Sequence, residues 1–143
     1  TKYPDQSKQK HMAVLEQMKL LVSLAQIDGV ITTQERNYII NIGRANGFYP
    51  DEVAPLLERR HELHVPQQLT PEQKFNYIFS LVLLMKIDTR MYREEVMFCS
   101  KIASHLGYDP EVMSELVASI TTNGMTDDEL IVLKAKAQKY LKH

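Results

Sequence analysis

Two short acidic segments contain the side chains of this sequence that are best suited to chemistry. In the first segment Asp28 is followed seven positions later by Glu35, and in the second Asp88 is followed seven positions later by Glu95. Carboxylate oxygens suit hard divalent cations such as calcium and magnesium. Because calcium takes about six to eight oxygen ligands, each segment needs backbone carbonyls, water or the other segment to complete a site. These acids are therefore candidate ligands of a divalent cation.

The same residues also have a structural interpretation. Thr32 and Glu35 have the spacing of a capping box, in which each side chain bonds the other residue's backbone N–H at the start of a helix. Asp28 lies where a helix is expected to end, and there its carboxylate can accept hydrogen bonds from the amides of the following turn. The second segment has Tyr92 at the cap position, which cannot form the reciprocal bond. Both interpretations, cation site and structural turn, stay open.

Helices are the elements expected to position the acidic segments. Apolar residues recur at spacings of three and four along nearly the whole chain, as on the buried face of a helix. No alternating run is long enough to indicate a strand. Helix starts are marked by two capping boxes and by a capping residue followed by proline, namely Thr70 with Gln73, Thr126 with Glu129, and Asp109 with Pro110. The chain is therefore predicted to be all-α, with about seven helices.

The two acidic segments belong to an internal repeat. At an offset of 60 residues, positions 21–57 align without a gap with positions 81–117. The alignment also pairs residues that the apolar face of a helix does not require. These pairs are Asp28 with Asp88, Glu35 with Glu95, Gly47 with Gly107, and Pro50 with Pro110. Positions 61–69, which include Pro66, are predicted to be the linker between the copies. We predict one domain over residues 1–143, with two helix–acidic loop–helix units and a C-terminal helix.

Composition and charge exclude several classes of function. The chain has 17 basic and 18 acidic side chains and a net charge of −1, and no basic run marks a nucleic-acid surface. No apolar stretch approaches the roughly 20 residues of a membrane-spanning helix, and no secretion signal is visible. The single cysteine, Cys99, lies in an apolar helical pattern, which favours a buried thiol in a reducing compartment. We expect a cytoplasmic protein with no nucleic-acid partner and no transmembrane segment.

The first acidic segment resembles a known family signature. An apolar helix, Asp28, Gly29, an apolar residue, a short spacer and then Glu35 are similar to the motif of the tellurite-resistance protein B family, also called TerB-like. The resemblance implies an all-α fold, a poorly defined role in stress-response and membrane-associated chaperone contexts, and acidic residues that bind a divalent metal. Carried over to this chain, the implied ligands are Asp28, Glu35, Asp88 and Glu95. The second copy departs from the motif at three positions, Thr89, Arg90 and Arg93, and this disfavours a paired site.

The predicted function is that of a non-catalytic binding module. The sequence has no nucleophile elbow, phosphate-cradling glycine loop, zinc-protease helix motif or metal-thiolate cluster, so we do not expect an enzyme. We predict a small helical domain that binds an unidentified protein partner or serves in a stress response. The alternative is a divalent-cation-binding protein that uses the acidic loops, with calcium or magnesium as the cofactor.

Overall fold

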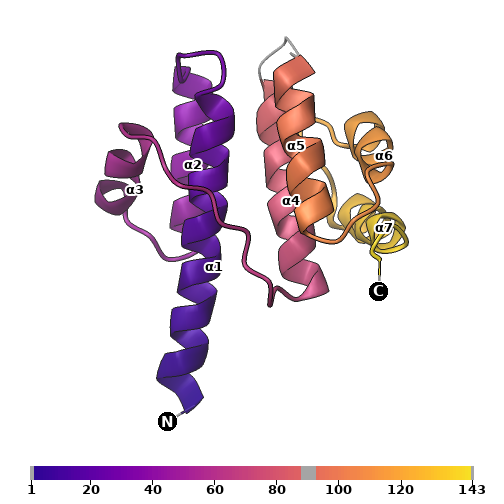
Figure 1. Cartoon of the computed structure of the whole chain (residues 1–143), viewed down its shortest axis with the longest axis horizontal. Helices are drawn as coiled ribbons and strands as arrows, with labels where there is room; N and C mark the ends of the chain where they lie inside the picture. Colours follow the sequence, from indigo (N-terminus) through magenta and orange to yellow (C-terminus); the bar gives the residue numbers. More distant parts are fainter. Residues whose placement is uncertain (1, 88–92, 143) are drawn as a thin grey trace. The chain divides into compact units, whose positions relative to one another are not determined.

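The computed structural model describes residues 2–87 and 93–142, with side chains described from residue 9 onward (Figure 1). Over these residues the chain forms seven α-helices and no strand. The helices are α1 (Lys2–Ala25), α2 (Thr33–Ala45), α3 (Pro50–Leu57), α4 (Pro71–Ile87), α5 (Arg93–His105), α6 (Val112–Ser119) and α7 (Asp127–Gln138). The all-α prediction is confirmed. None of these helices combines the length and the apolar character that crossing a bilayer requires.

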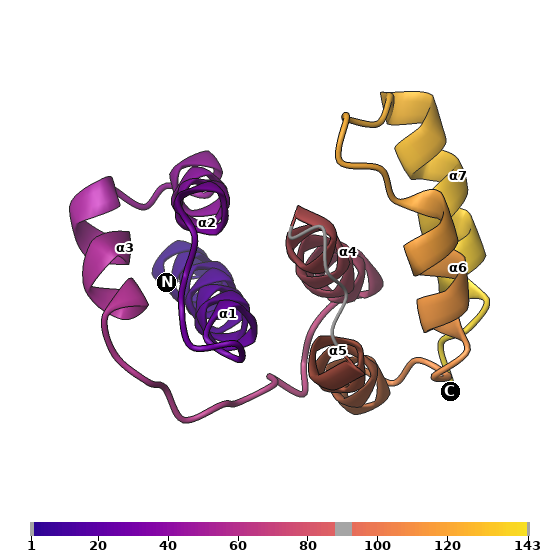
Figure 2. The same ribbon diagram turned by 90° about the horizontal axis from the view of Figure 1, so that it is seen from above.

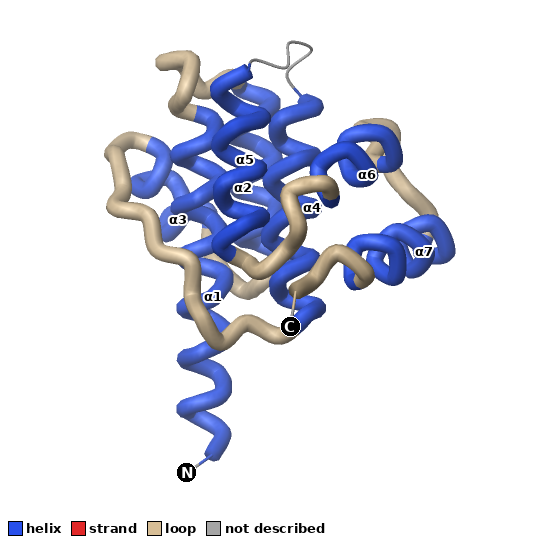
Figure 3. Tube along the Cα trace, turned by 45° about the vertical axis from the view of Figure 1, so that its right-hand side comes forward, coloured by secondary structure: helices blue, strands red, loops and turns tan. Residues whose placement is uncertain are grey.

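The helices fall into two compact units, Thr1–Pro66 and Gln67–His143. The boundary between them lies within the segment 61–69, which contains no helix (Figure 3). The predicted position of the linker is therefore confirmed, whereas the grouping of both units into one domain stays a prediction.

In the first unit, α1 and α2 form a hairpin and α3 packs against both (Figure 2). Apolar residues that recur at the helical spacing are fully buried in this unit, among them Met18, Leu21, Ile39 and Val53. Burial of such a side chain stabilises the fold by about 1.5–3 kcal/mol. Gly43 also lies here, and a Cβ at this glycine would be only 2.7 Å from Cγ2 of Val53. The missing side chain therefore allows the close approach of α2 and α3.

Each unit makes the same turn after its second helix. Gly47 has a φ of +90° and Gly107 a φ of +94°, in the left-handed region that favours glycine. The next residues, Phe48 and Tyr108, are buried, and their backbone N–H groups donate to the carbonyl five positions earlier, at 2.8 Å and 2.9 Å. At this turn the paired positions share backbone geometry as well as sequence.

In the second unit, α4 and α5 form the hairpin, α6 packs against both, and α7 adds a layer on α4 and α6 (Figure 2). The first unit, which ends after α3, has no counterpart of α7. The added helix therefore gives the second unit a surface that the first unit lacks.

In each unit, a polar side chain near the end of the first helix donates hydrogen bonds to backbone carbonyls near the end of the third helix. The ammonium of Lys86 donates to the carbonyl oxygens of Val117 at 2.6 Å and Ile120 at 2.5 Å. The last carbonyls of a helix lack intrahelical donors and attract a cation through the helix dipole. At the paired position, the side-chain amide of Gln26 donates to the carbonyl of Arg59 at 3.1 Å.

Two helix starts agree with the predicted capping boxes. The N–H of Thr70 donates to Oε1 of Gln73 at 2.9 Å, and the N–H of Gln73 donates to Oγ1 of Thr70 at 3.1 Å. Thr126 and Glu129 make the same reciprocal pair at the start of α7, with the same two distances. Both helix starts could therefore be predicted from the local sequence.

The start of α6 differs from its prediction. The sequence predicts Asp109 as the cap and Pro110 as the first helical residue, but α6 begins at Val112. The carboxylate of Asp109 accepts the N–H of Glu111 at 3.0 Å, and its carbonyl accepts the N–H of Val112 at 2.9 Å. These bonds form a separate turn before the helix starts. The carboxylate oxygen that was predicted to cap α6 accepts a hydrogen bond within this turn instead.

Candidate functional site

Glu35 is part of the start of α2. It lies at the third position of the helix and is 5% exposed. Its Oε1 accepts the N–H of Thr32 at 2.9 Å, and its own N–H donates to Oγ1 of Thr32 at 3.1 Å. The first turn also favours a negative charge through the helix dipole. The predicted capping box is therefore confirmed, and a cation at Glu35 would have to share a carboxylate that already holds the helix cap.

Asp28 is exposed in the turn between α1 and α2. Its Oδ1 accepts the N–H of Val30 at 3.4 Å, which is the bond of an Asx turn but longer than the usual range of about 2.7–3.2 Å. The adjacent Gly29 has a φ of +94°, as expected for a glycine that ends a helix. The carboxylate of Asp28 thus stays accessible to solvent or to a cation.

Glu95 occupies in α5 the position that Glu35 occupies in α2, and it is 4% exposed. One turn further along, Cys99 is fully buried, as predicted. Burial above all, and the nearby charge of Glu95, raise the pKa of the Cys99 thiol to about 12. Such a thiol stays protonated at neutral pH and is suited to packing rather than to nucleophilic attack.

Asp88, the remaining candidate ligand, lies outside the described residues. In the first unit the predicted donor set consists of Asp28 and Glu35 alone. Across the described side chains, positions 9–87 and 93–142, no three His, Cys, Asp or Glu residues gather as a group that could hold a metal ion. A cation site at any of the predicted acids stays a prediction.

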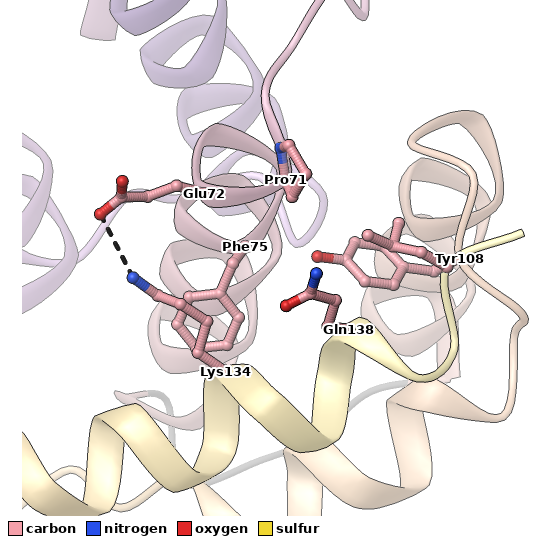
Figure 4. A pocket seen from close by; sticks show the side chains of 7 residues that line it. Pro71, Glu72, Phe75, Tyr108, Lys134 and Gln138 are labelled. Atoms are coloured by element: carbon pink, nitrogen blue, oxygen red, sulfur yellow. Dashed lines mark hydrogen bonds and ion pairs between the residues drawn. The ribbon is translucent and has the colours of Figure 1, made fainter. Parts of the chain in front are cut away.

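A pocket of about 220 Å³ lies in the second unit, between the start of α4, the turn after α5, and α7 (Figure 4). Within it, Nζ of Lys134 lies 3.2 Å from Oε1 of Glu72 and 5.8 Å from the centroid of the Phe75 ring. The lining residues are Pro71, Glu72, Phe75, Tyr108, Lys134, Gln138 and Leu141. This α4–α7 pocket therefore combines apolar walls with one ion pair, a phenol and an amide.

A wider hollow, of about 410 Å³, lies along α7. This α7 groove is lined by Ser119, Met125, Asp128, Glu129, Val132, Leu133 and Lys136. Val132 is 54% exposed, and the adjacent Ile131 is 66% exposed. A groove bordered by exposed apolar side chains is a candidate surface for binding another molecule.

The sequence patterns did not predict either hollow. The lining residues of the α4–α7 pocket come from elements far apart in the chain, whereas those of the α7 groove all lie within positions 119–136. The α4–α7 pocket lies partly at positions of the repeat. The 60-residue offset pairs Phe48 with Tyr108 inside the aligned range, and the same offset extended beyond that range pairs His11 with Pro71.

Comparison with known proteins leaves the family of this chain a prediction. No family model, curated protein or solved structure matches it. The resemblance of the first acidic segment to the TerB-like motif therefore remains an expectation from the sequence.

Proposed function

We propose that this chain is a non-catalytic helical module that binds a protein partner through α7, while its acidic loops serve as turns and helix caps. The TerB-like motif supports a stress-response context for this module, and the single buried cysteine supports a cytoplasmic location. The observation that carries the proposal is the exposed apolar face of α7, which borders the α7 groove.

The size and burial of the apolar side chains support α7 as the binding element. Ile131 and Val132 are more than half exposed, whereas Leu133 and Ala137 of the same helix are buried against the rest of the unit. Because one side of α7 already packs on α4 and α6, the exposed pair is not needed for that packing. A partner that covered the pair would gain about 25 cal/mol for each Å² of apolar surface removed from water.

The charge of the first turn of α7 defines the kind of partner. Asp127, Asp128 and Glu129 follow one another there. Asp128 and Glu129 line the groove together with one basic residue, Lys136, so acidic side chains outnumber basic ones in the lining. Hydrogen bonds from the backbone and side chain of Thr126 lower the pKa of the Glu129 carboxyl, which keeps it ionised at neutral pH. The fitting partner is therefore a protein segment with apolar side chains flanked by lysine or arginine.

Replacement of Val132 with aspartate tests this proposal. The change puts a charge into the apolar part of the groove, and we expect partner capture from a lysate to fall at least about tenfold, equivalent to about 1.4 kcal/mol. Ala135→Asp is the matched control, because Ala135 is exposed on the same helix and does not line the groove. The readout is the amount of each captured protein, measured by quantitative mass spectrometry at low and at high salt.

The expected result has a defined pattern. A partner lost with Val132→Asp, retained with Ala135→Asp and weakened by salt supports binding at the α7 groove. If both variants capture the same proteins in the same amounts as the wild type, α7 is not the binding element and the proposal fails.

A further inference from the structure

The α4–α7 pocket has a filled counterpart in the first unit. There the ring of His11 stacks on Phe48, with ring centroids 4.1 Å apart and planes 17° from parallel. At the offset of 60 residues, these two positions are Pro71 and Tyr108, which both line the pocket. The ring that covers the aromatic residue in the first unit is thus replaced by the smaller proline in the second.

The outer wall of the pocket comes from the part of the second unit that is not repeated. Lys134 and Gln138 project from α7 (Figure 4). Leu141, which also lines the pocket, follows that helix in the chain. The hollow beside Pro71 is therefore bounded by added residues, which give it an amide and the lysine that pairs with Glu72 of α4.

Tyr108 places a polar group in the pocket that its packing role does not require. The residue is only 2% exposed, and no hydrogen bond joins its hydroxyl to another described residue. The hydroxyl is not a buried atom without a partner, so it reaches the solvent in the pocket. Figure 4 shows the hydroxyl pointing into the pocket. Phe48 fills the paired position without a hydroxyl, so the ring alone suffices for the turn. Burial raises the pKa of Tyr108 to about 12, which keeps the hydroxyl protonated and able to donate at neutral pH.

The charges that line the pocket cancel. The ammonium of Lys134 is paired with Glu72 at 3.2 Å and also lies over the Phe75 ring. An anionic ligand would have to displace Glu72 from this lysine, and a cationic ligand would meet the lysine itself. A neutral ligand fits without breaking the pair.

We propose that the α4–α7 pocket binds a small neutral ring compound that carries one hydroxyl or amide group. The polar group of the ligand bonds the hydroxyl of Tyr108, and its ring contacts Phe75 and Leu141. An apolar cavity of roughly 150 Å³ accepts benzene, so the volume of about 220 Å³ suits one ring with a small substituent. The site is separate from the α7 groove proposed above for a protein partner, and it does not depend on that proposal.

Titration of the full chain with three matched probes tests the pocket. Phenol, toluene and benzoate have a similar ring and differ in the polar group, and binding is followed by amide chemical shifts in NMR spectra. We expect phenol to bind about three- to tenfold more tightly than toluene, the gain of one hydrogen bond, and benzoate to bind more weakly than phenol. Tyr108→Phe is expected to lower phenol affinity to that of toluene and to leave toluene affinity unchanged.

A second variant tests the origin of the pocket independently. Pro71→His restores the residue that covers the aromatic ring in the first unit, and we expect it to lower the affinity for both phenol and toluene at least about tenfold. If Tyr108→Phe fails to fold, Pro71→His still tests whether the pocket binds the ring compounds. The proposal is overturned if the wild type shows no saturable shifts up to the solubility limit of phenol, if Tyr108→Phe binds phenol normally, or if Pro71→His binds both probes as the wild type does.

Discussion

Replacement of Lys86 with methionine is expected to lower the free energy of unfolding by about 3 kcal/mol. The ammonium makes two charge-assisted hydrogen bonds, to the carbonyls of Val117 at 2.6 Å and Ile120 at 2.5 Å, where α6 ends. Methionine fills the volume of the lysine stem but cannot donate, so both carbonyls lose their partner and the helix end loses its cation. The measurement is urea denaturation followed by circular dichroism, with the free energy extrapolated to zero denaturant.

Lys134→Met is the matched control for this variant. The side chain of Lys134 is 40% exposed, and its partner Glu72 is 71% exposed, so solvent screens the pair. Loss of such a surface ion pair is expected to cost less than about 1 kcal/mol. Equal losses in the two variants would show that Lys86 acts only as a surface charge and that it does not hold the end of α6.

Gly43→Ala is expected to destabilise the first unit by about 2 kcal/mol, although alanine is the better helix former by about 1 kcal/mol. A Cβ at Gly43 would lie 2.7 Å from Cγ2 of Val53 and 3.1 Å from the sulfur of Met18. Since Val53 is short, β-branched and fully buried, it cannot swing aside, and α2 and α3 must move apart. Urea denaturation again gives the change in unfolding free energy.

The effect of Gly43→Ala on the free energy of unfolding should change sign when Cγ2 of Val53 is removed. In a Val53→Ala background the Cγ2 atom is absent, and the remaining close contact is with the flexible side chain of Met18, which can shift. Gly43→Ala should then stabilise the chain through its helix propensity. This double-mutant cycle isolates the contact between the two positions. Gly43→Ala that is neutral or stabilising in the wild-type background would contradict the close packing described for these helices.

Features set by a few neighbouring residues could be predicted from the sequence. The capping boxes at Thr32 and Thr126 involve side chains three positions apart, so the spacing alone defines the geometry. The burial of Cys99 follows from the helical period, because Ile102 and Ala103 on the same helix face are apolar and buried. At Asp109 two local structures compete for the same carboxylate, a helix cap and a turn. The carboxylate bonds within the turn, and α6 starts later than predicted.

Features that depend on contacts between distant helices could not be predicted. Lys86 reads as an ordinary charged residue after an apolar helix, and only the packing of α6 on α4 places two carbonyls beside its ammonium. The α4–α7 pocket likewise needs Pro71, Tyr108 and Gln138 to meet from three parts of the chain. In the candidate cation site, the sequence identified Glu35 as a helix cap but not how fully the carboxylate would be buried, because burial depends on α2 packing against its unit.

Thermal unfolding of the full chain in magnesium or calcium tests most directly whether Asp28 and Glu35 serve the fold rather than a cation. A ligand at a hundred times its dissociation constant stabilises the folded state by about 2.7 kcal/mol, which raises the unfolding midpoint of a small domain by several degrees. We predict that about 10 mM of either cation leaves the midpoint within about 1 °C of its value in chelator. A rise of several degrees that disappears in Asp28→Asn, a variant that keeps the Asx turn, would contradict this prediction and establish a cation site in the first acidic loop.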